Sequence, residues 1–166
     1  MIIDGFTRQE TIALTGLTSA RLHYFDRTGL VKPKKYGKTK RPICIYSWEQ
    51  LLQLIAIKDL RRKISLQTVR TIIDTLGKGG FSDSLRDKHL VVAGDTVLWV
   101  EDSWKDFPEK ILTVAGTKSG KNQYVFAFMI TIDDLITTVW KNARKAKKRI
   151  DIESFEERAK ATPTAA

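Results

Sequence analysis

The sequence has almost no residues that form disulfides or bind transition metals. Its 166 residues include one cysteine, Cys44, and two histidines, His23 and His89, which lie far apart in the chain. A single cysteine cannot form a disulfide within the chain or supply a thiolate cluster for a metal. The distance between the histidines disfavours a histidine metal site. We therefore expect neither a metal nor a cofactor.

Long hydrophobic runs are absent as well. The longest, YVFAFMI at 124–130, has seven residues, whereas a membrane-spanning helix needs roughly 20. The N-terminus lacks the pattern of a signal peptide, so we expect a cytoplasmic protein without a membrane partner. No nucleophile is paired with a base at a spacing that specifies chemistry, and we do not expect an enzyme.

Positive charge is what the chain has in excess, with 29 Lys and Arg against 19 Asp and Glu and a net charge of +10. Residues 1–76 hold 14 cations and 6 anions, a net +8, while residues 77–130 are neutral and residues 131–166 carry +2. The first half is thus expected to meet a polyanion. On charge alone, a basic surface that only aids solubility is the alternative.

Two short helices joined by a tight turn are predicted near the N-terminus. Thr7 and Glu10 have the spacing of a capping box, so a helix begins just after the threonine, and Gly16 ends it. Thr18 can cap a second helix over about 19–27. This arrangement is typical of a helix-turn-helix.

The second helix has one face to bury and one that is free. Leu22 and Phe25 fall together when the helix is unrolled at about 100° per residue, and they form the buried stripe. The opposite side is small at its leading end and cationic or hydrogen-bonding further along, which suits insertion into a DNA groove. An ordinary polar surface helix is the alternative. The candidate DNA-contacting residues here are Thr7, Thr18, Ser19, Ala20, Arg21, His23, Tyr24 and Arg27.

A basic segment follows the second helix. LVKPKKYGKTKRPICIYS is punctuated by two prolines and a glycine, and its short segment ICIY at 43–46 indicates a strand. A basic loop that closes on a strand behind a helix-turn-helix is typical of a wing, whose cations follow the sugar-phosphate backbone. Its candidate DNA-contacting residues are Lys34, Lys35, Tyr36, Lys38, Lys40 and Arg41.

Two further helices are predicted as scaffold. Ser47 and Gln50 form a second capping box, and Ser65 can cap the helix that follows. Apolar residues line one side of each helix. They are Trp48, Leu51, Leu52, Ile55 and Leu60 in the first, and Leu66, Val69, Ile73 and Leu76 in the second.

Several residues along this order of elements act together as markers of a family. They are Thr7, Gly16, Leu22, Tyr24, Asp26, Arg27, Gly29, Leu30, Pro33, Tyr46, Ser47 and Leu66. With them, residues 6–76 resemble the N-terminal winged-helix domain of the MerR family of bacterial transcription regulators. The resemblance implies a homodimer that recognises a near-palindromic operator in double-stranded DNA.

Three positions depart from the pattern of that family. His23 stands where the family usually has Arg, and Cys44 stands where it usually has Arg two residues before the wing tyrosine. Both changes remove a cation from a position where the family contacts the DNA backbone, and Arg21 and the crowded wing can compensate. Lys63 replaces a common glycine before the fourth helix.

The second half fits the family less well. GKGGF at 77–81 interrupts the chain, and no sustained heptads follow for the long coiled coil of typical members. HLVV and TVLWVE around AGD, and ILTV and YVFAFMI around AGTKSGKNQ, predict two hairpins. A helix follows whose apolar face is expected to pack on the sheet or on a second subunit. That face consists of Leu135, Ile136, Val139, Trp140 and Ala143.

We therefore predict an α+β protein in three parts. A winged helix-turn-helix domain spans residues 1–76, a small α+β dimerisation domain with an antiparallel sheet and a helix spans 77–160, and a disordered tail spans 161–166. The basic run RKAKKR at 144–149 is most simply a solvated helix end that complements the helix dipole, with a DNA contact outside the main site as the alternative.

An aromatic pocket for a cationic compound is weighed against a plain aromatic core in the second half. Packing is favoured, so we expect no small-molecule effector. The residues concerned are Trp99, Trp104, Phe107, Phe126, Phe128 and Trp140, with Glu101 or Asp102 as counter-charge.

The leading functional hypothesis is a dimeric DNA-binding regulator that represses a nearby operon. The familiar activators of the family combine an effector site with a long coiled coil, and neither is visible here. An antitoxin-like protein, which binds a partner through its C-terminal half and regulates its own promoter, is the alternative. In overall build the chain also resembles the small MerR-type repressors of type V-K CRISPR-associated transposons.

Overall fold

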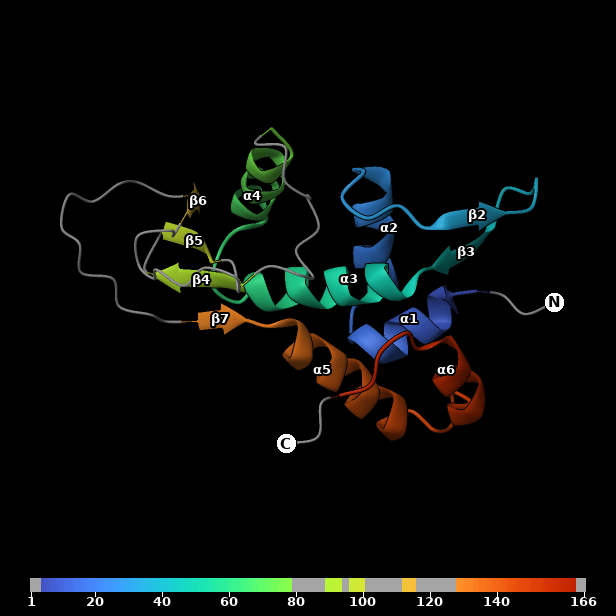
Figure 1. Cartoon of the computed structure of the whole chain (residues 1–166). Coiled ribbons are helices and arrows are strands. Elements are labelled where there is room, and N and C mark those ends of the chain that lie inside the picture. The colour runs from blue at the N-terminus through green and yellow to red at the C-terminus, as the bar shows by residue number, and fades with distance from the viewer. Residues whose placement is uncertain (1–3, 79–88, 94–95, 101–111, 116–127, 164–166) are drawn as a thin grey trace. The chain divides into compact units, whose positions relative to one another are not determined.

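The computed structural model describes residues 4–78, 89–93, 96–100, 112–115 and 128–163. The chain forms two compact units, one of Met1–Ile55 with Asp133–Ala166 and the other of Ala56–Ile132 (Figure 1). Within the described part, no helix is long and apolar enough to cross a membrane. The α+β fold with an N-terminal helix-turn-helix is confirmed.

The first unit begins with the predicted helix pair, α1 (Arg8–Thr15) and α2 (Ser19–Arg27). The Glu10 amide donates to Thr7 Oγ1 at 3.3 Å, and the Thr7 amide donates to Glu10 Oε2 at 2.8 Å, which completes the capping box. Gly16 ends α1 with a φ of 69°, a left-handed conformation that favours glycine. Thr18 caps α2 by accepting from the Arg21 amide at 3.2 Å. Local sequence therefore determines both helix starts.

A three-stranded antiparallel sheet of order β1-β3-β2 accompanies these helices. Its strands are β1 (Phe6–Thr7), β2 (Lys34–Tyr36) and β3 (Ile43–Tyr46). β3 is the predicted ICIY strand. The prediction that the basic segment before it is only a loop was wrong, because Lys34 pairs with Ile45 and Tyr36 with Ile43. All three residues of β2 are exposed, so this lysine-bearing edge strand has no apolar alternation that would reveal it.

Helices α3 (Trp48–Leu60) and α4 (Leu66–Lys78) follow. The second predicted capping box is present, with the Gln50 amide donating to Ser47 Oγ at 3.1 Å. The Thr68 amide donates to Ser65 Oγ at the start of α4. All five apolar residues predicted for α3 are buried. The division between the two units falls within α3, after Ile55.

The C-terminal helices α5 (Ile132–Lys145) and α6 (Ile152–Arg158) belong, from Asp133 onward, to the first unit. Phe155 on α6 is fully buried. Its ring centroid lies 5.9 Å from that of Phe6, 6.3 Å from that of Trp48 and 5.1 Å from that of Trp140. One side chain near the C-terminus thus joins the first strand, the start of α3 and α5 in a single aromatic cluster.

Polar contacts hold the same helices against α1. The Arg158 guanidinium donates to Glu10 Oε1 at 2.7 Å and to the Gly5 carbonyl at 2.9 Å. Asn142 Nδ2 donates to the Leu14 carbonyl at 2.7 Å. Both ends of α1 are therefore bonded to the C-terminal segment, and Figure 1 shows α6 beside this helix.

This grouping differs from the expected division at residue 76, which assigned the last helix to the second domain. The five predicted apolar residues of α5 are all buried, but Trp140 packs edge-on against Phe155 within the first unit. Of the tail expected to be disordered, residues 161–163 are described, and Ala161 accepts a hydrogen bond from Trp140 Nε1 at 2.9 Å. Residues 164–166 lie outside the described part.

The second unit contains a four-stranded antiparallel sheet of order β6-β5-β4-β7. Its strands are β4 (His89–Ala93), β5 (Thr96–Val100), β6 (Leu112–Ala115) and β7 (Phe128–Ile130). The first predicted hairpin is confirmed, because β4 pairs with β5.

The second predicted hairpin was wrong, because β6 pairs with β5 whereas β7 pairs with β4 at the opposite edge. Residues 116–127 separate the two strands, a longer interval than the usual hairpin loop of about 2–5 residues. The strand order is that of a Greek key, in which a fourth strand returns beside the first.

The ion pair between α6 and α1 predicts an acid-sensitive contribution to stability. Burial raises the pKa of Glu10, but hydrogen bonds from Arg158 and Thr7 outweigh it and hold the pKa below its ordinary value. Such a carboxyl stabilises the fold above its ordinary pKa, and the contribution is lost as the pH falls through the lower, folded pKa.

We expect Glu10→Gln to lower the free energy of unfolding by about 1.5 kcal/mol near pH 7. The difference from wild type should shrink as the pH falls below the ordinary glutamate pKa, because wild type then loses the same charge. Urea unfolding at a series of pH values measures both effects. A constant difference between the two proteins down to the lowest pH would contradict the assignment.

Candidate nucleic-acid interface

Helix α2 presents the free face that its sequence predicts. Leu22 and Phe25 are 0% and 1% exposed and pack α2 against the rest of the first unit. The residues expected on the other side are all exposed. They are Ser19, Ala20, Arg21, His23, Tyr24 and Arg27. Small side chains at the leading end allow the backbone of α2 to approach base edges closely, and the larger ones beyond them carry hydrogen-bonding and cationic groups.

The far end of α2 is organised around Tyr24. The Arg27 guanidinium lies 6.0 Å from the centre of its ring, and the ring meets Phe25 edge-on. Thr28 Oγ1 donates to the Tyr24 carbonyl at 2.8 Å. Gly29, at a φ of 76°, then turns the chain toward the wing. The Tyr24 and Arg27 side chains are thus supported where they emerge at the surface.

The two candidate threonines differ from the rest of the set. Thr7 is half-buried, and its hydroxyl donates to Glu10 Oε2 at 3.0 Å besides accepting from the Glu10 amide. Thr18 is exposed, but its hydroxyl accepts from the Arg21 amide. Both side chains already have a role in capping the helices, so Thr7 in particular is less available for DNA than the sequence suggests.

The wing, residues 34–46, consists of β2, the turn at 37–42 and β3. Lys35 Nζ lies 2.7 Å from Asp26 Oδ2 on α2, in an ion pair whose Asp26 side chain is only 10% exposed. Gln50 Nε2, at the start of α3, donates to the Lys32 carbonyl at 2.6 Å just before the wing. The wing is therefore fixed to both neighbouring helices, and Lys35 is part of that attachment.

The other cations of the wing extend into solvent. Lys34, Lys38, Lys40 and Arg41 are exposed, and none forms an ion pair with a carboxylate in the described part of the chain. Tyr36 is also exposed, at 52%, and pairs across the strands with the exposed Ile43. The wing thus offers unpaired positive charge beside an apolar patch.

Cys44 points away from this surface. It is buried, and Arg8 Nη2 on α1 donates to its Sγ at 3.2 Å. The neighbouring Tyr46 is fully buried, and burial raises the pKa of its hydroxyl. A cation from α1 therefore lies against β3 at the position where the resemblance led us to expect an arginine of the strand.

Three residues that position the interface were missed in the sequence, namely Asp26, Gln50 and Arg8. Asp26 was noted only as a family marker, and Gln50 only as a capping residue. Their contacts with Lys35, with the Lys32 carbonyl and with Cys44 each join different elements. Local spacing gives no signal for such contacts.

The described residues hold no group of three or more His, Cys, Asp or Glu side chains that could bind a metal. Of the aromatic pocket weighed for the second half, Trp104, Phe107 and Phe126 lie outside the described part. Trp140 packs on Phe155 in the first unit.

The geometry of the first unit is that of a winged helix-turn-helix, a class of DNA-binding domain. Two capped helices meet at a tight turn, the second exposes a polar and cationic face, and a two-stranded basic wing is attached to it. Residues 6–76 match the family model of the MerR HTH family regulatory protein. This part of the chain is therefore a MerR-family helix-turn-helix domain, that of a DNA-binding transcription regulator. Comparison with curated proteins and with solved structures gave no match.

Proposed function

We propose that this chain is a sequence-specific, dimeric transcription regulator that represses a nearby operon by occupying a near-palindromic operator. The observation that carries the proposal is the exposed face of α2 next to a wing with four cations that have no carboxylate partner among the described residues, within a domain of the MerR family. It is a binding function without catalysis, exercised in the bacterial cytoplasm and at the nucleoid when the operator is bound.

The two surfaces have different roles in this proposal. α2 enters the major groove, where His23 and the small residues at its start contact base edges. Lys34, Lys38, Lys40 and Arg41 follow the backbone beside that groove and contribute affinity that does not depend on sequence. Lys35 holds the wing to α2 through Asp26 rather than binding phosphate.

Repression by a dimer is the finer part of the proposal. An operator with two half-sites needs two recognition helices, and we assign dimerisation to the sheet-containing second unit in place of a long coiled coil. The longest described helix, α5, has 14 residues. Without an expected effector, occupancy of the promoter is the simplest mode of control. The resemblance in build to the type V-K transposon repressors supports transposon genes as the controlled operon.

The test combines operator mapping with mass measurement. Genomic DNA fragments bound by the full-length chain are sequenced, and light scattering then gives the mass of the chain alone and on one mapped fragment. We expect sites with two inverted half-sites, a mass of two chains per site, and lower transcription from the adjacent promoter. Binding to no fragment would overturn the proposal, and a small protein that co-purifies at equal amount would favour the antitoxin alternative.

A further inference from the structure

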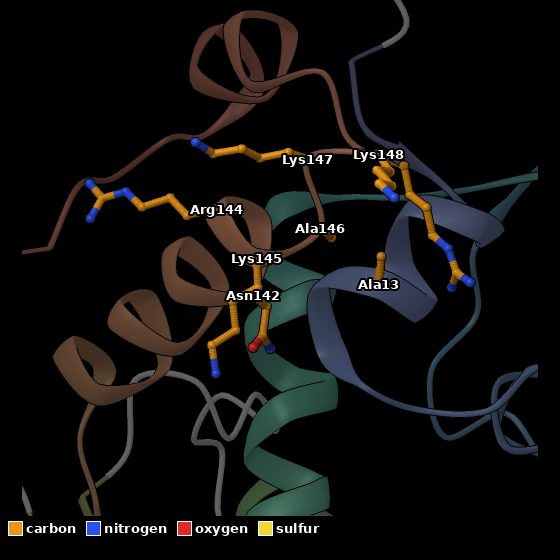
Figure 2. Close-up of a pocket in the computed structure, with 8 residues that line it drawn as sticks. Ala13, Asn142, Arg144, Lys145, Ala146, Lys147 and Lys148 are labelled. Carbon is orange, nitrogen blue, oxygen red and sulfur yellow. The ribbon is translucent and has the colours of Figure 1, made fainter.

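A basic pocket lies in the first unit, and none of the residues that line it was assigned to the interface. It is an open hollow of about 540 Å³ at the end of α5 and the turn that follows, beside α1 (Figure 2). Ala13 of α1 forms part of its wall, and its small side chain leaves room there. Five of its eight lining residues are cations, and none is acidic. The cations are Arg144, Lys145, Lys147, Lys148 and Arg149.

The pocket has a fixed framework. Ile150 is buried, and its amide donates to the Ala146 carbonyl at 2.9 Å, while the Arg149 amide donates to the same carbonyl at 2.7 Å. Asn142 ties α5 to the Leu14 carbonyl of α1. The turn that carries the cations is therefore held in place relative to the helix-turn-helix.

A favourable interaction with the helix dipole explains only some of these cations. Arg144 and Lys145 lie in the last turn of α5, where cations complement the helix dipole, and Arg144 also lies 5.7 Å from the centre of the Trp140 ring. Lys147, Lys148 and Arg149 come after the helix. No ion pair joins any of the five cations to a carboxylate of the described part. Exposed like charges this close together favour an anionic ligand.

The position of the pocket beside α1 suggests which kind of anion it binds. In a helix-turn-helix bound to DNA, the second helix occupies the major groove and the first helix crosses the sugar-phosphate backbone. The pocket adjoins that first helix, α1, through Ala13. Backbone phosphates that flank the contacted groove are therefore the anions that we consider for this pocket.

We propose that this pocket binds backbone phosphates of the operator outside the segment contacted by α2 and the wing. The proposal rests on the proposed function and extends it, because it makes the C-terminal turn a second DNA-binding element. It adds affinity and lengthens the contacted DNA without adding base recognition.

The test uses the full chain with Lys147→Gln, Lys148→Gln and Arg149→Gln combined. The probe is a duplex selected by the wild-type chain from random-sequence DNA, prepared with flanks of roughly one helical turn, about 10 bp, and also trimmed to its core. On the long duplex the slope of log affinity against log salt should become shallower by roughly 5.4, since each phosphate contact contributes about 0.9 and the bound dimer loses three contacts from each chain. On the trimmed duplex the variant should equal wild type.

Two control proteins separate a pocket from general charge. Lys141→Gln removes an exposed lysine of α5 outside the pocket, and it should leave both slopes unchanged. A charge-retaining variant with Lys147→Arg, Lys148→Arg and Arg149→Lys should keep the wild-type slope on the long duplex. Unchanged melting of all variants shows that they fold.

The outcomes are distinct. If wild type binds the duplex and the triple Gln variant matches it on both lengths, the pocket proposal is overturned while the proposed function stands. If wild type selects no DNA, both are overturned. If inorganic phosphate or polyphosphate binds wild type but not the variant, and flanking DNA makes no difference, the ligand is a small phosphate compound and the assignment to DNA is wrong.

Discussion

Phe155→Ala is expected to lower the free energy of unfolding by about 3–5 kcal/mol. The Phe155 ring is fully buried among Phe6, Trp48 and Trp140. Its truncation removes apolar burial and leaves a cavity between these rings, which cannot all move inward because they belong to different elements. The effect should reach the DNA-binding domain, because β1 and the start of α3 are both part of it.

Denaturant unfolding of the full-length chain measures this change. Glu156→Ala is the matched control, since the adjacent Glu156 side chain is exposed and such surface substitutions usually change stability by less than about 0.5 kcal/mol. The Phe155→Ala variant should also bind DNA more weakly at temperatures where its first unit melts and that of wild type does not. A loss below about 1 kcal/mol would mean that α6 is not packed on the domain as described.

Local signals were sufficient for the helix-turn-helix. Each capping box places its partners three residues apart, so a helix start depends on very few residues and can be recognised without the rest of the fold. The left-handed turn at Gly16 is local in the same way. The exposed face of α2 followed from the position of Leu22 and Phe25 alone, and the structure confirms it.

Contacts between distant residues could not be predicted in this way. Glu10 and Arg158 are 148 positions apart, and nothing in either neighbourhood indicates that α6 returns to α1. The apolar face of α5 was recognised correctly, but an apolar face does not specify what covers it. The Greek key order could not be predicted for the same reason, because local sequence does not show which edge of the sheet β7 extends.

In the candidate site, too, features that depend on local sequence could be predicted and contacts between distant residues could not. Exposure of the α2 face and of the wing cations follows from local pattern, whereas the pairing of Lys35 with Asp26 depends on how the wing closes over α2. The sequence therefore indicated which residues of α2 and the wing are exposed, but not that Lys35 is paired within the protein, and the assignment of these residues to DNA stays a prediction.

Mutations in α2 and in the wing should change DNA binding in different ways, because α2 is proposed to recognise bases and the wing to contact the backbone. His23 lies on the exposed face of α2, so His23→Ala should cost roughly 1–3 kcal/mol on the selected operator and little on random DNA. Lys38 and Lys40 lie in the wing turn without a carboxylate partner in the described part. Replacing both with Gln should weaken the two kinds of DNA alike and make the salt slope shallower by roughly 3.6, because the bound dimer loses two phosphate contacts from each chain.

Titrations of each variant against operator and random duplexes at several salt concentrations distinguish the two roles. Lys141→Gln again serves as the control for loss of a single exposed charge, and its binding should match wild type on both duplexes. His23 stands where the family usually has arginine, so a backbone contact is the competing assignment. If His23→Ala weakens binding to random DNA as much as to the operator, the α2 face at that position contacts phosphate. Base recognition would then have to come from the small residues at the start of the helix.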